Sequence, residues 1–254
     1  MSRRGLARGG AIRERAAGAL GAGIAWTWAL LAPPRCGICG GPSAPTLPLC
    51  PSCERALAGR SPPPPRIPGV DLAWSALPYE GAARSLVVAI KFARRVGLAA
   101  VAAEAIVRSA PPGLLGGTLV PVPPAPLRSR LRGFDPAEEL ALALAARTSA
   151  PLLACLARRE GPRQVGRARA ARLADPPRVR AIGRVPDDAV LVDDVLTTGA
   201  TLGACARALR AAGAGRIFAV TFARAGRVAG APAPAARPET GHAAARLDRP
   251  DAGA

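Results

Sequence analysis

The chain has 254 residues, enough for one large domain or for one domain with a small module. Half of the residues are hydrophobic but only 3% are aromatic, which predicts a core of Ala, Leu and Val and excludes a coiled coil, a collagen-like fibre and a polytopic membrane protein. The net charge of +18 suits an anionic partner, but Lys91 is the only lysine among 35 basic residues, so a GC-rich genome is an alternative explanation of the charge.

Residues 1–32 combine a basic start with an apolar run. Five arginines lie within residues 1–15, and the 17 residues 16–32 are apolar and contain Trp26 and Trp28. This arrangement resembles a signal peptide, and the run is at the lower limit for a membrane-spanning helix. The alternative is a helix that packs on the protein or on a partner. The cysteine pattern that follows favours this alternative, and with it a cytoplasmic protein without stable membrane insertion.

Residues 33–58 contain four cysteines in the pattern C-x2-C-x10-C-x2-C. These are Cys36, Cys39, Cys50 and Cys53. Two close thiol pairs can converge on a tetrahedral Zn²⁺, and a module of this size needs a metal because its core is too small. Four thiolates leave no open coordination position, so the zinc would be structural, in a reducing compartment. Two disulfides, or four ordinary cysteines, are the alternatives.

The remainder of the chain divides into a linker, an α/β domain and a tail. Residues 59–69 are Pro-rich and predict a stiff linker, 70–224 form the main domain, and 225–254 predict a disordered tail. Strands are expected over 70–79, 118–122, 151–157, 189–193 and 216–222, and helices over 82–93, 98–109, 136–147 and 201–212. Alternation of strands and helices predicts a parallel sheet covered on both faces. Asp135 is expected to cap the helix that Pro136 opens.

The segment VLVDDVLTTGATL, residues 190–202, carries the clearest chemistry. Asp193 and Asp194 follow a buried strand, at the sheet edge where open α/β folds bind ligands. A loop rich in Thr and Gly then enters a helix, whose backbone N–H groups suit an anion. Carboxylates beside a phosphate site make sense if they face neutral hydroxyls, and a pentose 5-phosphate offers both groups. An ordinary turn with a polar loop is the alternative.

This segment resembles the thirteen-residue phosphoribosyl pyrophosphate (PRPP) motif of type I phosphoribosyltransferases. The resemblance implies that Asp193 and Asp194 hold the ribose hydroxyls and act as the catalytic acids. It implies that the loop cradles the 5-phosphate through Thr197, Thr198, Gly199, Ala200 and Thr201.

Three further segments resemble the ComF (competence protein F) family, over residues 25–224. They are the VPVP run at 120–123 with Arg132-Gly133-Phe134, the Gln164-to-Arg172 segment, and Ile90-Lys91-Phe92. A four-Cys module before such a domain also matches the family. Asp135 stands where the family usually has Asn, and Asp175 lies near another common Asn.

The resemblance implies a type I phosphoribosyltransferase fold preceded by a zinc-ribbon-like module. Residues 70–110 would form the hood that holds an acceptor base. Mg²⁺ would bridge pyrophosphate and ribose. The residues expected to contact PRPP outside the motif are Lys91, Arg132, Gln164 and Arg172, with Arg128 and Arg130 in the same loops. A solvated basic surface is the alternative for each arginine.

Three functions follow from the resemblance. The first is a phosphoribosyltransferase acting on an unidentified base acceptor. The second is a PRPP–Mg²⁺-binding protein of DNA uptake and natural transformation, with single-stranded DNA and a DNA-uptake helicase as partners. The same PRPP–Mg²⁺-binding protein could instead act in nucleotide-linked metabolism. The third is a non-catalytic PRPP sensor.

Overall fold

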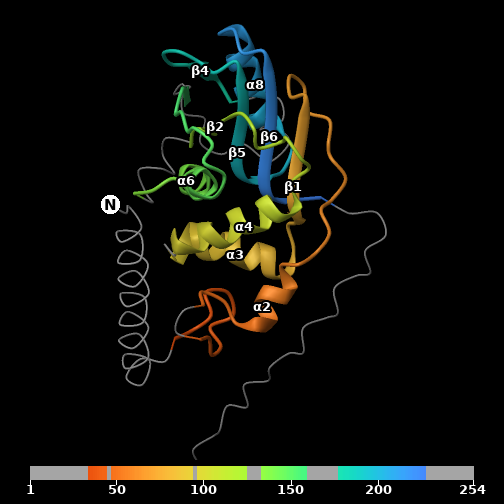
Figure 1. Cartoon of the computed structure of the whole chain (residues 1–254), viewed down its shortest axis with the longest axis vertical. Coiled ribbons are helices and arrows are strands. Elements are labelled where there is room, and N and C mark those ends of the chain that lie inside the picture. Colours follow the sequence, from red (N-terminus) through yellow and green to blue (C-terminus); the bar gives the residue numbers. More distant parts are fainter. Residues whose placement is uncertain (1–33, 45–46, 94–95, 125–132, 159–176, 227–254) are drawn as a thin grey trace, which may run out of the picture.

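The computed structural model describes residues 34–44, 47–93, 96–124, 133–158 and 177–226 (Figure 1). The apolar run at 16–32 and the tail beyond residue 226 lie outside these ranges. Within the described part of the chain, no helix is both long and apolar enough to cross a bilayer.

A four-stranded parallel sheet forms the centre of the molecule. Its strands are β1 (Leu72–Pro78), β2 (Thr118–Pro121), β5 (Asp188–Leu196) and β6 (Arg216–Arg224). Their order is β1-β6-β5-β2, and every neighbouring pair is parallel. The predicted α/β class with a parallel sheet is therefore confirmed.

Helices cover both faces of this sheet because the strand residues alternate between the two sides. On one face, Val190 and Val192 of β5 pack with α3 (Gly81–Ala93), α4 (Ala99–Ser109) and α6 (Pro136–Thr148). On the other face, Ala189 and Leu191 pack with α8 (Ala200–Ala211). A 3₁₀ turn, η1 (Val96–Leu98), precedes α4, and α2 (Pro51–Ala56) lies below α3 in Figure 1. The two apolar cores are thus separated by the sheet.

The segment predicted as a strand over 151–157 behaves differently. It touches the sheet at a single bridge, between Leu152 and Leu119. The chain then forms β3 (Leu156–Arg158), which pairs antiparallel with β4 (Val179–Ala181) in a sheet of its own. Pro121 at the end of β2 has no N–H to donate to Leu153 O, which would continue the pairing, and Cys155 N donates to Leu153 O instead. The prediction of a main-sheet strand here is wrong.

The first predicted strand also has an unexpected place. The sequence assigns residues 70–110 to a hood beside the sheet, but β1 is the edge strand of the sheet and pairs with β6 from Leu72 to Pro78. Helices α3 and α4 pack on the sheet face rather than above its end. The region named as a hood is therefore part of the main core.

The Pro-rich segment 59–69 lies against the domain along its length. Ser61 Oγ donates to Ala76 O of β1 at 3.0 Å, and Arg224 Nη1 donates to Pro63 O at 2.6 Å. Ile67 is only 6% exposed and belongs to the α8 core. We call residues 59–69 the strap, because they are hydrogen-bonded to the sheet and packed against α8.

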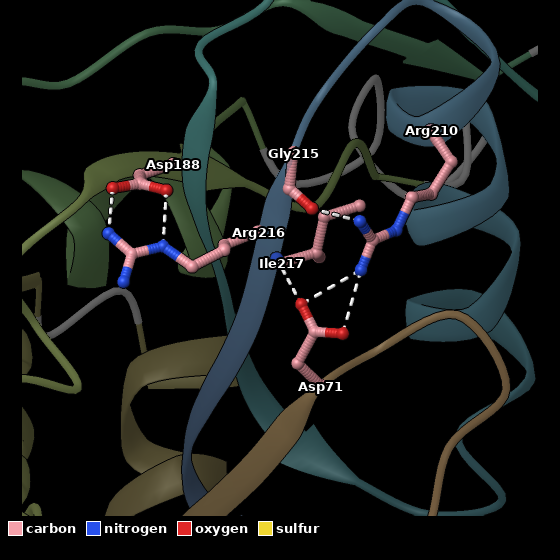
Figure 2. Close-up of polar contacts among 6 residues, drawn as sticks. All are labelled: Asp71, Asp188, Arg210, Gly215, Arg216 and Ile217. Carbon is pink, nitrogen blue, oxygen red and sulfur yellow. Dashed lines mark hydrogen bonds and ion pairs between the residues drawn. The ribbon is translucent and has the colours of Figure 1, made fainter.

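A group of ion pairs fastens the amino-terminal ends of three strands (Figure 2). The Asp71 carboxylate accepts from Arg210 Nη2 at 2.7 and 2.8 Å and from the Ile217 backbone N at 2.8 Å. Arg216 pairs with Asp188, through Nε at 2.7 Å. These contacts lie at the amino-terminal ends of the strands. The site described next lies at the opposite, carboxyl ends.

Candidate functional site

A cavity of about 300 Å³ opens at the carboxyl ends of β2 and β5. Its charged and polar lining residues are Tyr79, Lys91, Asp135, Arg158, Asp193, Asp194, Thr197 and Thr201. The apolar part of the wall includes Val122, Pro123 and Pro124, directly after β2. The cavity thus brings together residues from six separate segments of the chain, as expected at the carboxyl ends of parallel strands.

The two acids at the end of β5 lie within this cavity. Asp193 Oδ1 accepts from the Asp194 backbone N at 2.8 Å. Asp194 Oδ2 lies 2.5 Å from Lys91 Nζ, which reaches it from the last turn of α3. The Lys91 ammonium therefore compensates the charge of this buried Oδ2.

Burial raises the pKa of Asp193 well above its ordinary value, and the Asp194 charge adds to the effect. The backbone N–H of Asp194 and the charge of Lys91 oppose it without cancelling it. This pair of carboxyls therefore gains stability from a ligand that supplies hydroxyl donors or a cation.

The loop after β5 forms a small cavity of about 30 Å³ at the amino end of α8. It is lined by Thr197, Thr198, Gly199, Ala200 and Thr201, among others. Gly199 is the helix N-cap, with a φ of 77°, and Thr198 Oγ1 accepts from Ala200 N at 3.3 Å. The backbone N–H groups at this terminus suit an anion.

Gly199 has a packing role in this loop. A Cβ at this position would lie 3.2 Å from Ile67 of the strap. The left-handed φ and this contact with Ile67 both favour glycine. The strap therefore forms the back of the loop.

Asp135 caps α6 as predicted, since its Oδ1 accepts from Ala137 N at 3.0 Å. Burial raises its pKa to about 6, with further contributions from the charges of Glu138 and Asp194, against the lowering effect of the cap hydrogen bond. A third carboxyl therefore faces the same cavity, and at neutral pH it carries a charge that its surroundings disfavour.

Two lining residues were missed by sequence reasoning. Tyr79 directly follows β1, and Arg158 ends β3. The rule that ligands lie at the carboxyl ends of parallel strands would have found Tyr79 if the strand at 70–79 had been placed in the sheet. Arg158 gave no separate signal, because it begins a span that contains nine arginines over residues 158–184.

Several predicted contact residues lie outside the described ranges. These are Arg128, Arg130, Arg132, Gln164 and Arg172. The structure brings together Lys91, Asp193, Asp194 and the loop at 197–201.

A second site is formed by the four cysteines of the N-terminal module. The Sγ atoms of Cys36, Cys39, Cys50 and Cys53 all lie within 4.8 Å of one another, and those of Cys39 and Cys50 are 3.7 Å apart. A tetrahedral zinc with Zn–S bonds of about 2.3 Å requires sulfurs about 3.8 Å apart. The four residues are therefore positioned to hold a metal ion and are compatible with structural zinc.

Backbone donors support the sulfurs. Ile38 N points to Cys36 Sγ at 3.5 Å and Gly41 N to Cys39 Sγ at 3.4 Å, and Gly40 adopts a φ of 72° that gives the turn its shape. Burial acts against ionisation of Cys36, but the backbone N–H groups of Cys39, Cys50 and Ile38 outweigh it and lower its pKa to about 6. Burial and the neighbouring cysteines raise the pKa of Cys53, so the backbone favours the thiolate form at Cys36 in particular.

Comparison with protein-family models and with curated proteins gave no match. The functional assignment therefore depends on the geometry of the cavity and on the sequence motifs that line it.

Proposed function

We propose that the chain is a ComF-like protein with a phosphoribosyltransferase-type domain that binds PRPP together with Mg²⁺. One observation carries the proposal: Asp193, Asp194 and the amino end of α8 lie around two cavities that share lining residues at the carboxyl end of β5. A pentose with a 5-phosphate presents two hydroxyls and one anion to such a site.

Each described residue of the site has a role in this proposal. Asp193 and Asp194 accept hydrogen bonds from the ribose hydroxyls, which removes part of the cost of burying their charge. The loop at 197–201 binds the 5-phosphate through backbone N–H groups and Thr hydroxyls. Arg158 and Lys91 line the same cavity and supply positive charge for the pyrophosphate.

The donor set also fits Mg²⁺. Carboxylate oxygens are the hard ligands that this ion prefers, and Asp193 and Asp194 both line the cavity. When bound, Mg²⁺ would neutralise charge on the pyrophosphate and ease its departure. The protein itself contributes positioning of the ribose, exclusion of water by the apolar wall at Val122 to Pro124, and stabilisation of the leaving charge by Arg158.

Calorimetry with PRPP and Mg²⁺ tests the site. Asp193→Asn/Asp194→Asn is expected to lose most of the affinity, because the amides are weaker acceptors for the ribose hydroxyls. Asp187→Asn/Asp188→Asn is the matched control: it makes the same charge change at the other end of the same strand, away from the cavity. Equal affinity of the two double variants would overturn the assignment.

A turnover screen then separates the functional settings. Release of pyrophosphate in the presence of a candidate base identifies an active phosphoribosyltransferase. Salt-dependent binding of single-stranded DNA without release favours the role in DNA uptake and natural transformation. PRPP binding with neither property identifies a PRPP-sensing module.

A further inference from the structure

A second cavity lies between the four-Cys module and helix α4. It has a volume of about 190 Å³ and takes no part in the site described above. We call it the module groove. Its walls are mainly aliphatic, with Leu47, Leu49 and Leu57 on the module side and Ala100 and Val101 on α4. Leu47 is 47% exposed, so this apolar groove is open to solvent and lacks a cover among the described residues.

The chain enters the described structure beside this groove. Pro34 O accepts from Ser43 N at 3.0 Å, and Ser43 Oγ donates to Leu47 O at 2.7 Å. Two hydrogen bonds through one residue thus connect the first described residue to a residue of the groove wall. The apolar run 16–32, with its two tryptophans, ends immediately before this point.

We propose that the segment 16–32 docks on its own protein, with the indole ring of Trp28 in the module groove. A cavity of about 150 Å³ holds a benzene ring, so 190 Å³ accommodates one indole and not two. Glu54 on the groove rim offers a carboxylate acceptor to the indole N–H, which needs a partner when buried.

The tether favours this occupant over a second copy of the chain. Only residues 29–33 separate Trp28 from Pro34, and a span of six residues reaches up to about 20 Å when extended. A short tether gives an effective concentration in the millimolar range, far above that of another protein molecule in dilute solution. In this arrangement the apolar run covers the module groove between the four-Cys module and α4.

Fluorescence of the full chain with one tryptophan tests the proposal. With Trp26→Phe and Trp74→Phe, all emission comes from Trp28. We expect blue-shifted emission and weak quenching by acrylamide. Adding Ala100→Arg, which fills the groove from a half-buried position on α4, should shift the emission to the red and increase the quenching constant several-fold.

Ala211→Arg is the matched control, because it adds the same side chain at an exposed position in the last turn of α8. It should leave Trp28 shielded. A second background, Trp26→Phe with Trp28→Phe, reports through Trp74 of β1 that the Ala100→Arg chain is folded.

Four results would overturn the proposal. They are solvent-like Trp28 emission in the parent, equal quenching with Ala100→Arg and with Ala211→Arg, shielding that disappears on dilution, and shielding that appears only with lipid vesicles. Dilution dependence would identify a second copy as the occupant of the groove, and vesicle dependence would identify a lipid surface as the partner of the apolar run.

Discussion

At the residue scale, Lys91 occupies a position that arginine would fill less well. Its ammonium lies 2.5 Å from a buried carboxylate oxygen, and the two side chains are 24% and 13% exposed. A compact point charge fits this space, whereas a planar guanidinium is wider and needs several acceptors. The physical setting thus explains why the only lysine of an arginine-rich chain stands here.

Removing this charge should destabilise the protein. Lys91→Met leaves Asp194 partly buried without its cation, and we expect a loss of about 1–3 kcal/mol in the free energy of unfolding. Lys91→Met/Asp194→Asn should recover much of that loss. Urea unfolding of the two single variants, the double variant and the parent measures the coupling, and strictly additive effects would contradict the ion pair's role.

Asp135 gives a prediction that depends on pH. Its pKa is raised from 3.8 to about 6 in the folded protein, so folding takes up a proton and the ionised carboxyl opposes folding. This penalty is absent below 3.8 and complete above about 6, and stability from this group therefore falls as the pH rises through that window.

Asp135→Asn should remove this penalty while keeping the helix cap, because Asn and Asp are similar N-caps. We expect a gain of on the order of 1 kcal/mol at pH 7.5, and no gain near pH 4. Thermal unfolding of both proteins between these pH values measures it. A variant that is less stable than the parent at pH 7.5 would show that the charge at the helix terminus matters more than burial.

At the element scale, the sequence predicted most helices and strands but not their neighbours. The acids at 193 and 194 and the cap at Asp135 follow from local patterns, and the structure contains them as expected. The position of β1 in the sheet cannot be predicted from local patterns. Its partner β6 lies 146 residues away, and strand periodicity carries no information about pairing. Tyr79 was missed for this reason.

The same limit explains the error over 151–157. Leu152 and Leu153 form part of an apolar run that matches a buried strand, yet Leu153 is 39% exposed and only Leu152 reaches the sheet. Hydrophobicity predicted an element, but Pro121 of β2 lacks the N–H donor that a continued ladder with this segment requires. The lack of a backbone N–H donor therefore explains why residues 153–157 do not join the main sheet.

The contacts of Asp71 give a prediction for the edge strand. Asp71→Ala removes the acceptor of Ile217 N, at the start of β6, together with the Arg210 pair (Figure 2). We expect a loss of about 1–2 kcal/mol in the free energy of unfolding, most of it from the unsatisfied backbone N–H. Asp188→Ala removes a solvent-exposed pair alone and should cost less. Chemical denaturation compares them, and an equal cost would contradict this account.

At the scale of the whole molecule, the four-Cys module and the α/β domain share one apolar core. Cys36, Leu49 and Leu57 pack in the same cluster as Ile106 of α4 and Val190 of β5. Leu98 lies against Gly37 so closely that an added Cβ would come within 2.7 Å of it. The four-Cys cluster therefore supports the larger domain as well as the module.

Removal of the metal should accordingly lower the stability of the whole chain. We expect a chelator to reduce the Tm of the transition followed by far-UV circular dichroism, and stoichiometric Zn²⁺ to restore it. Cys39→Ser should reduce the Tm without added chelator, since Cys39 is an exposed ligand position rather than a core residue. An unchanged transition would show that the α/β domain folds without a metal ion in the four-Cys cluster.

The strap has a consequence for how such a protein is inherited. Ile67 lies behind Gly199, and Gly69 is packed on Ala206, so the floor of the phosphate loop comes from residues that precede the domain in sequence. A recombination event that fused a different N-terminal segment to residue 70 would keep the motif of residues 190–202. It would remove the strap residues that pack against the loop. We therefore expect homologous proteins to contain the module, the strap and the sheet together, in the same order.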